Sequence, residues 1–352
     1  MATNPLLGEL IAIVRQEKGS DLHLTEGRVP VIRVFGQLVP LVKKPELTRS
    51  DLHGFIESLL SAEQKEIFLR DREVDFGVEE AEGRLRGHAF FQRNKIGIAL
   101  RFISKDIRTL EQLGIPLVLE KFTTQKQGFF LVVGPTGHGK STTLAALIDQ
   151  INQTRLEHII TIEDPIEYIF TPQKSIIDQR EVRSDAKDFM TALNGVFRQD
   201  ADVLMIGEMR NPETMSTAVT AAETGHLVFS TLHTNTASQT VERIIDSFDS
   251  TQQNQIRLQL ANTLSGIFSQ RLIPKIGGGL VPAYELLVNN NAVANLIREN
   301  RVFEIDTTIE TGADQGMVTM DRSLADLVKA KQITLNDAYA FSNNPQTLER
   351  LL

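Results

Sequence analysis

The chain has 352 residues, more than one ordinary hydrophobic core accommodates, and this length favours about two to three domains. Its hydrophobic content of 41% is typical of a packed globular protein, and the absence of cysteine excludes disulfides, a cysteine zinc site and a thiol nucleophile. The net charge of −8 arises entirely after residue 124. An acidic balance argues against nucleic acid as a partner, because phosphates require a basic stripe.

No apolar stretch approaches the roughly 20 residues of a membrane-spanning helix, and the first residues lack the basic region of a signal peptide. We therefore expect a cytoplasmic protein that is not integral to the membrane. No short-period repeat or low-complexity tract is visible in the sequence, which argues against a solenoid.

The first hundred residues have the pattern of a small α+β domain. Leu6, Leu10 and Ile13 recur at helical spacing and predict an amphipathic helix that ends near Gly19. The other elements expected here are a hairpin over 29–42 that turns at Gly36, a helix over 52–69, and strands over 76–78, 85–91 and 96–102.

A second pattern begins at Gly128, where an unbroken apolar run is typical of a strand buried on both faces of a parallel sheet. A glycine-rich turn and a helix over 142–151 follow, and further short strands are expected at 158–162, 203–206 and 227–232. Strands that alternate with helices are typical of a doubly wound α/β domain. After about Gln252 we expect mostly helix, interrupted by a glycine loop over 277–279.

The strongest motif is the phosphate-binding loop pattern G-x-x-x-x-G-K-[ST], matched by Gly134-Pro135-Thr136-Gly137-His138-Gly139-Lys140-Ser141. Glycines let successive backbone N–H groups converge on phosphate oxygens, and the N-terminus of the following helix adds its positive dipole end. We expect Lys140 to bridge the β- and γ-phosphates of ATP, Ser141 to ligate Mg²⁺, and Thr142 to complete the nucleotide site.

Two glutamates directly follow short apolar strands. Glu163 comes after 159–162 and Glu208 after 203–206, and ligands of open α/β sheets bind at the carboxyl ends of strands. Hydrolysis needs one carboxylate to orient or deprotonate the attacking water and another to hold the hydration shell of the metal. Both glutamates are therefore candidate catalytic residues.

Two histidines bracket the strand expected at 227–232. His226 and His233 are seven residues apart, a spacing that disfavours ligation of one metal ion by both side chains. A role in sensing the γ-phosphate competes with a purely structural role. The sequence alone leaves both roles open.

Four ordered segments resemble the motifs of the type II and type IV secretion ATPase superfamily. They match its Walker A, Asp box, Walker B and His box at residues 134–141, 161–167, 198–208 and 222–233. Residues 19–24 also resemble the start of that superfamily's PAS-like domain. The resemblance implies a PAS-like α+β domain over 1–103, a linker over 104–114, a RecA-like P-loop ATPase core over 115–270 and a C-terminal helical region over 271–352.

The resemblance also implies roles for particular residues. Glu163 matches the carboxylate of the Asp box and Glu208 that of Walker B, while His226 and His233 match the histidines of the His box. Three arginines match those that relatives bring to the nucleotide, namely Arg86 and Arg101 from the PAS-like domain and Arg198 just before the Walker B strand.

Within the superfamily the sequence is most similar to the type IV pilus retraction ATPases, the PilT family. Residues 292–299 read AVANLIRE, similar to the AIRNLIRE motif that this family requires for retraction, and they also fit an ordinary amphipathic helix. Pilus-extension and type II secretion relatives usually carry a tetracysteine zinc insertion and a long N-terminal extension, neither of which is expected here. Three departures are His138 in place of the more frequent serine, Asn194 where relatives often have arginine, and Ala294 in the retraction motif.

The resemblance implies a homohexameric ring that hydrolyses Mg·ATP at the cytoplasmic side of the inner membrane. The ring would act on an inner-membrane pilus platform protein, in some systems beside a paralogous retraction ATPase, to drive pilin depolymerisation and twitching motility. Two alternatives remain, a pilus-assembly or type II secretion ATPase and an accessory nucleotide-binding ring subunit with slow turnover. The sequence does not reveal the direction of mechanical work.

Overall fold

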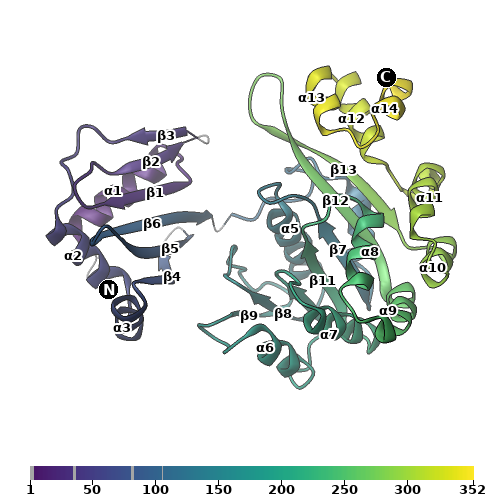
Figure 1. Cartoon of the computed structure of the whole chain (residues 1–352), viewed down its shortest axis with the longest axis horizontal. Coiled ribbons are helices and arrows are strands. Elements are labelled where there is room, and N and C mark those ends of the chain that lie inside the picture. The colour runs from purple at the N-terminus through teal and green to yellow at the C-terminus, as the bar shows by residue number, and fades with distance from the viewer. Residues whose placement is uncertain (1–3, 35–36, 81–82, 105) are drawn as a thin grey trace. The chain divides into compact units, whose positions relative to one another are not determined.

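The computed structural model describes residues 4–34, 37–80, 83–104 and 106–352. The chain divides into two compact units, one formed by residues 1–106 with Glu167–Ile169 and the other by Ile107–Ile166 with Phe170–Leu352 (Figure 1). We describe each unit separately.

The first unit is an antiparallel sheet of six strands with helices packed on it. The strands are β1 (Asp21–Thr25), β2 (Val31–Val34), β3 (Gln37–Pro40), β4 (Glu73–Glu80), β5 (Gly83–Gln92) and β6 (Lys95–Ser104), in the order β3-β2-β1-β6-β5-β4. Helices α1 (Pro5–Gln16), α2 (Arg49–Leu59) and α3 (Ala62–Asp71) contact β1, β6 and β4 respectively. The α+β prediction is confirmed, and the turn expected at Gly36 lies outside the described residues.

The helices of this unit form where local sequence caps them. Asn4 caps α1 by accepting hydrogen bonds from the backbone N–H groups of Leu6 and Leu7, and Thr48 and Ser61 open α2 and α3 with capping boxes. The buried face of α1 carries Leu7, Leu10, Ile11 and Val14, which pack into the core of the unit.

The second unit is built on a seven-stranded sheet in the order β13-β12-β7-β11-β10-β8-β9. Its strands are β7 (Gly128–Val133), β8 (His158–Glu163), β9 (Ile176–Glu181), β10 (Val203–Ile206), β11 (Leu227–Leu232), β12 (Leu264–Pro274) and β13 (Leu280–Val288). All neighbouring strands run parallel except β13, which is antiparallel to β12. Every residue of β7, β10 and β11 is buried, as expected for strands covered on both faces.

Helices pack against this sheet (Figure 1). The helices of this unit are, in chain order, α4 (Glu120–Thr123), α5 (Lys140–Thr154), α6 (Phe189–Val196), α7 (Pro212–Glu223), α8 (Ala237–Asp246), α9 (Ser250–Thr263), α10 (Asn291–Arg298), α11 (Ile305–Thr311), α12 (Met320–Lys329), α13 (Leu335–Phe341) and α14 (Pro345–Leu351), with short 3-10 turns at 117–119, 302–304 and 313–315. The last five, α10 to α14, lie beside the β12–β13 hairpin and α9. Among the residues described, no helix combines the length and the apolarity that crossing a bilayer demands.

The expectation of a mostly helical chain after Gln252 is wrong for residues 264–288. These residues form the β12–β13 hairpin, and β12 extends the sheet beside β7 and runs through the boundary expected between residues 270 and 271. The strand was missed because it is largely buried on both faces, so that its sequence, LSGIFSQRLIP, lacks the alternation of apolar and polar residues that identifies a strand. A separate small core joins the far end of this hairpin to α12, α13 and α14.

Candidate active site

The loop between β7 and α5 has the geometry of a phosphate cradle. Gly134, Gly137 and Gly139 all have positive φ angles, of 140°, 81° and 81°, which only glycine adopts without strain. At Gly134 a side chain is also excluded by contact, since its Cβ would lie 2.3 Å from the backbone oxygen of Gln270. Helix α5 begins at Lys140 without a side-chain cap, so the loop leads directly into a helix N-terminus that favours an anion.

The lysine of the loop is held by its own surroundings. Lys140 is 8% exposed, and its Nζ donates hydrogen bonds of 2.9 Å to the backbone oxygens of both Gly134 and Pro135. A third contact of 3.3 Å joins Nζ to Nδ1 of His233, which also lies 3.3 Å from the hydroxyl of Thr136. Ser141 and Thr142 occupy the first turn of α5 beside this group, where the sequence places the metal and phosphate ligands.

His233 connects the lysine to the Walker B carboxylate. Since an ammonium group can only donate, Nδ1 of His233 accepts from Lys140, which leaves the ring proton on Nε2. Nε2 lies 3.4 Å from Oε2 of Glu208, completing a line of contacts from Lys140 through His233 to Glu208. The structure therefore brings together three of the residues that the sequence predicted.

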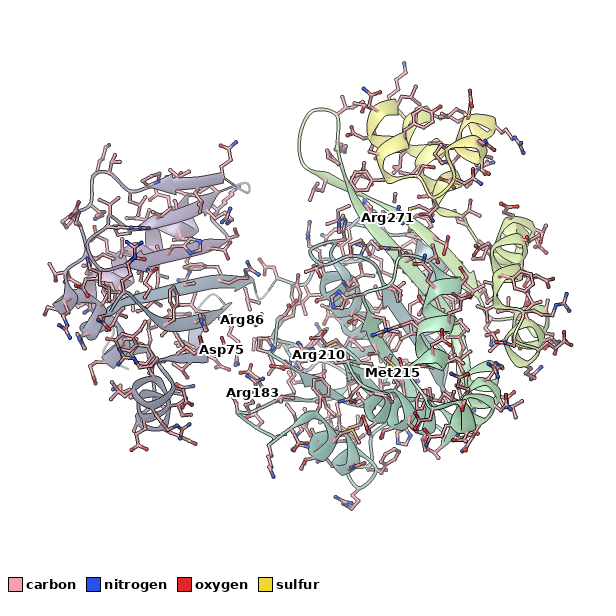
Figure 2. All side chains as sticks on the ribbon, in the orientation of Figure 1. Asp75, Arg86, Arg183, Arg210, Met215 and Arg271 are labelled. Atoms are coloured by element: carbon pink, nitrogen blue, oxygen red, sulfur yellow. The ribbon has the colours of Figure 1, made fainter. Side chains whose placement is uncertain are left out.

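Glu208 also has a cationic partner, Arg210, that the sequence analysis missed. The guanidinium of Arg210 donates a hydrogen bond to Oε1 of Glu208 and lies 3.9 Å from the carboxylate of Asp164 (Arg210 is labelled in Figure 2). Burial raises the pKa of Glu208, but the hydrogen bond and charge of Arg210, together with His233, outweigh burial and hold that pKa below its ordinary value. Position 210 belongs to no recognised motif, and its signal in the sequence is a positive charge two residues after a candidate catalytic carboxylate.

Glu163 lies at the end of the strand next to that of Glu208. Ile162 is paired with Ile206, and the N–H of Gly207 donates to the oxygen of Ile162, so that the two glutamates follow neighbouring strand ends. Glu163 is 5% exposed and accepts hydrogen bonds from the hydroxyl of Thr161 at 2.7 Å and the side-chain amide of Gln179 at 3.2 Å. Its carboxylate is thereby fixed in orientation, as a base that positions water must be.

His226 and Arg198 lie at the opposite edge of the same sheet. His226 precedes β11, its backbone oxygen accepts from the N–H of Gly128 at the start of β7, and its Nδ1 lies 2.9 Å from the oxygen of Ala221. Its ring also stacks edge-on against Phe197, the neighbour of Arg198. The structure therefore does not bring His226 or Arg198 to the P-loop of their own chain, and their assignment to the nucleotide stays a prediction.

Arg86 and Arg101 are direct cross-strand partners in the first unit, on β5 and β6. Nε of Arg101 donates a 2.8 Å hydrogen bond to Asp21, whose carboxylate also pairs with Arg33 at 3.7 Å. Burial raises the pKa of Asp21, while hydrogen bonds from Ser20 and Arg101 lower it by more, so Asp21 stays ionised and orients Arg101. The approach of either arginine to a nucleotide stays a prediction.

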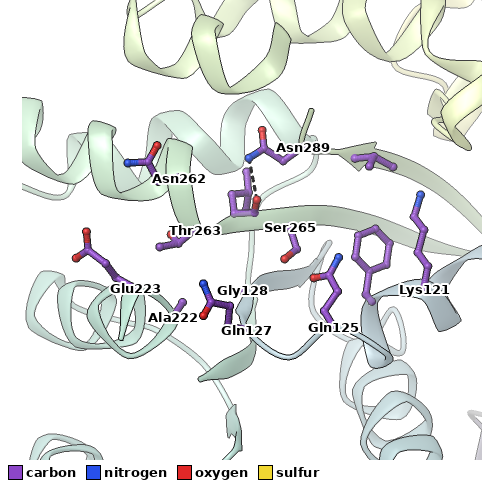
Figure 3. A pocket seen from close by; sticks show the side chains of 13 residues that line it. Lys121, Gln125, Gln127, Gly128, Ala222, Glu223, Asn262, Thr263, Ser265 and Asn289 are labelled. Carbon is purple, nitrogen blue, oxygen red and sulfur yellow. Dashed lines mark hydrogen bonds between the residues drawn. The ribbon is translucent and has the colours of Figure 1, made fainter. Parts of the chain in front are cut away.

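A polar hollow of about 610 Å³ lies at the amino edge of the second sheet, away from the P-loop (Figure 3). Within the part of the chain that the structure describes, the side-chain oxygens of Gln125 and Asn289 are buried there without a hydrogen-bond partner. The amide nitrogen of Asn289 donates to the oxygens of Ala261 and Leu264, which fixes the start of β12. A hollow with unpaired acceptors of this kind is a site for ordered water.

The α/β sheet, the glycine cradle at the carboxyl end of β7 and the two carboxylates on neighbouring strand ends define the chain as a P-loop ATPase. A family model described as "Type II/IV secretion system protein" matches residues 11–323, and the chain belongs to that family.

Two curated relatives come from Pseudomonas aeruginosa. The type IV pilus retraction ATPase PilT is 41% identical over 339 residues, covering 96% of this chain and 98% of the relative. The type IV pilus ATPase PilU is 40% identical over 349 residues, covering 98% and 90% respectively. Among solved structures, the crystal structure of the pilus retraction motor PilT with bound ADP superposes with a TM-score of 0.91 at 46% identity, covering 97% of this chain and 98% of that one.

Proposed function

We propose that this chain is the subunit of a ring motor that hydrolyses Mg·ATP to drive type IV pilus retraction. The observation that carries the proposal is the line of contacts from Lys140 through His233 to Glu208, which joins the proposed phosphate-binding residue to one of the two candidate catalytic carboxylates. Similarity over almost the whole chain to PilT, a pilus retraction ATPase, supports the direction of work.

The residues present fit a Mg-nucleotide. The glycine cradle and the uncapped start of α5 favour phosphate oxygens, and Lys140 would leave the oxygens of Gly134 and Pro135 for the β- and γ-phosphates. Ser141 would hold the metal, which supplies charge neutralisation of the phosphates when bound. Pro135, Thr136, Gly137, His138, Gly139 and Thr142 would complete the cradle.

The two glutamates would divide the work of hydrolysis. Glu163, fixed by Thr161 and Gln179, would orient the attacking water and accept its proton, and Glu208 would hold the water shell of the site. When Lys140 turns to the phosphates, Nδ1 of His233 would lose that donor and keep the hydroxyl of Thr136, 3.3 Å away, as its remaining one. His233 would thus report γ-phosphate occupancy to Glu208.

The arginines would complete the site in the assembled ring. Arg86 and Arg101 are directly paired across β5 and β6 of the first unit, and guanidinium groups can stabilise charge that develops on the γ-phosphate. His226 and Arg198, which lie away from the P-loop of their own chain, would act in this proposal through a neighbouring subunit. The domain division at 103, 114 and 270 is proposed with it, amended by the continuity of β12 across residue 270.

The cellular setting follows from the resemblance. We propose a homohexamer at the cytoplasmic side of the inner membrane that acts on the pilus platform protein, alone or beside a paralogous retraction ATPase, with no nucleic acid involved. The acidic balance of the chain is consistent with a function that does not involve nucleic acid.

An accessory ring subunit with slow turnover is the second candidate. The chain is nearly as similar to PilU, at 40%, as to PilT, at 41%. In addition, position 194 in α6, which is exposed, is an asparagine, whereas the resemblance leads us to expect an arginine there. A steady-state ATPase assay separates the two candidates, because an accessory subunit turns over far more slowly than a motor.

The test of the proposed function combines an enzyme assay with a deletion strain. Glu208→Gln keeps shape and hydrogen bonding while removing the charge, so ATP should still bind and hydrolysis should fall by roughly 10²-fold or more. The deletion strain should be hyperpiliated and non-twitching, and it should be restored by the native chain but not by Glu208→Gln. Glu213→Gln, at an exposed glutamate of α7, is the matched control. A strain that lacks pili altogether would identify an assembly ATPase instead.

A further inference from the structure

A single glutamine of β12 joins two parts of the nucleotide site. Gln270 is 2% exposed in a strand that is largely buried. Its side-chain Nε2 donates a 3.0 Å hydrogen bond to the backbone oxygen of His138 in the P-loop, and its Oε1 accepts a 2.6 Å bond from the hydroxyl of Thr143 in α5. The amide nitrogen of this buried side chain thus donates to the loop, and its amide oxygen accepts from the helix that follows the loop.

The same strand holds the loop at further points. The backbone N–H of Leu272 donates a 2.9 Å hydrogen bond to Nδ1 of His138, which therefore carries its ring proton on Nε2. Burial, with the charges of Lys140 and Arg271, lowers the pKa of His138, so the ring stays neutral and able to accept. Two loop glycines also lie close to Gln270. A Cβ at Gly134 would be 2.3 Å from the backbone oxygen of Gln270, and a Cβ at Gly139 would be 3.0 Å from its Nε2.

Anchoring the oxygen of His138 fixes a group that binds phosphate. The oxygen of His138 and the N–H of Gly139 belong to one planar trans peptide, in which they point in opposite directions. Holding that oxygen toward β12 therefore turns the N–H of Gly139 away from the strand. Gly139 is the residue from which α5 starts, and N–H groups at this position are those that a helix N-terminus offers to an anion.

We propose that Gln270 is a positioning residue of the nucleotide site, which orients the His138–Gly139 peptide toward the phosphates of the nucleotide. This inference rests on the proposed function, since it assumes that the P-loop binds a nucleoside phosphate. The bond to His138 carries the effect, and the bond to Thr143 only holds the amide in place.

The two bonds can be separated by substitution. Gln270→Met keeps the length of the side chain and removes both bonds, whereas Thr143→Val removes only the bond to α5. Asn289→Leu is the matched control, because Asn289 is also an amide that holds β12 through backbone oxygens, at the opposite edge of the sheet. All three are measured in the full-length chain by titration with ADP and by steady-state ATP hydrolysis.

We expect Gln270→Met to weaken ADP binding by about ten-fold, the size of one lost hydrogen bond to the loop, with KM for ATP rising in parallel and kcat changing less. Thr143→Val and Asn289→Leu should bind ADP within about two-fold of the native chain at comparable losses of thermal stability. Gln270→Ser, which leaves room for water, serves if Gln270→Met does not fold.

The inference is overturned if a folded Gln270 variant binds ADP as tightly as the native chain, or if Asn289→Leu weakens binding equally. In the second case the effect of Gln270 would be one of general stability. A native chain that fails to bind ADP would instead refute the proposed function, so the two failures are distinguishable.

Discussion

At the residue scale, Glu208 is defined by the charges around its carboxylate. Arg210 is more exposed than Glu208, with side-chain exposures of 65% and 23%, yet it is one of the groups that keep the carboxylate ionised against the effect of burial. Because the pKa of Glu208 in the folded chain is depressed, its charge persists as the pH falls below the ordinary value of 4.5. The charge that the proposed role of Glu208 requires is then present across the whole neutral range.

Removing that arginine should expose the effect of burial. In Arg210→Gln the hydrogen bond and the charge are lost, burial becomes the dominant influence, and the pKa of Glu208 rises. We expect the acidic limb of the kcat against pH profile to move to higher pH. Arg243→Gln, at an exposed arginine of α8, should leave the profile unchanged, and an unmoved limb in Arg210→Gln would show that Glu208 does not limit hydrolysis.

The central residues of this site are predictable from sequence, and those that support them are not. Lys140, Glu163, Glu208 and His233 each stand in a motif or at the end of a recognisable strand. Gln270 does not, because its role depends on β12 lying beside β7, a pairing between segments more than a hundred residues apart. Local patterns do not contain that information.

At the element scale, the β12–β13 hairpin buries an acid. Glu285 of β13 accepts a 2.8 Å hydrogen bond from the N–H of Ala237 at the start of α8, and burial raises its pKa to about 7. Ser269, its partner on β12, donates to the oxygen of Asn235 in the same loop. The hairpin thus holds the segment that follows His233.

Glu285 should make stability depend on pH. Its pKa is higher in the folded chain than the ordinary 4.5, so the folded state binds the proton more tightly and the free energy of unfolding falls as pH rises from about 4.5 to about 7, by about 3 kcal/mol. Glu285→Gln keeps the acceptor for Ala237 and removes the titration. Its gain in stability over the native chain, measured by urea unfolding, should therefore grow with pH across this window.

The control for that measurement is Glu242→Gln, at an exposed glutamate of α8. Other groups also titrate, and Asp21 and Glu208 have lowered pKa values whose effect on stability has the opposite sign. For this reason the difference between variant and native chain is compared at each pH. A difference that does not change between pH 5 and pH 8 would place the charge of Glu285 in a better solvated setting than the structure shows.

Helix α10 carries the segment that resembles the retraction motif. Val293, Ala294 and Ile297 are buried, whereas Arg298 is exposed and donates to the side-chain oxygens of Asn295 and of Asn262 on α9. The amphipathic helix expected from sequence is confirmed, and the buried position of Ala294 shows that its side chain faces the core.

Arg298→Ala should separate mechanical work from chemistry. Because Arg298 touches no residue of the nucleotide site, we expect ATP hydrolysis within a few-fold of the native rate, an unchanged oligomer and no restoration of twitching in a deletion strain. Arg322→Ala, at an exposed arginine of α12, is the control and should restore twitching. Normal twitching with Arg298→Ala would show that α10 is only a packed helix.

The fold itself was largely predictable where strands alternate with helices. Periodicity and glycine turns predicted the α+β unit and the strands β7, β8, β10 and β11 of the P-loop domain, since each of those elements carries its own pattern. The edge strand β9 (Ile176–Glu181) was not predicted. The hairpin over 264–288 escaped because β12 begins at Leu264, directly after α9 ends at Thr263, with no loop between them. A helix and a strand that adjoin in this way leave no break for a sequence to show.

At the scale of the whole molecule, hydrolysis in the proposed motor requires the first unit to supply its arginines to a nucleotide on the second. Arg101→Ala should lower kcat by about 10²-fold or more while ADP affinity stays within a few-fold, because a guanidinium that stabilises developing charge acts mainly in the transition state. Arg33→Ala is the matched control, since Arg33 shares the carboxylate of Asp21. Equal losses in both variants would assign Arg101 to the stability of the first unit.

Lys140 finally bears on how the site holds its ligand. Its ammonium is stripped of most of its water in the folded chain, where two backbone oxygens and an imidazole take the place of solvent. The cost of dehydrating this cation is therefore met during folding, and an arriving phosphate exchanges one set of polar partners for another. In the proposed site, this arrangement would trade a little thermodynamic stability for affinity toward the phosphates.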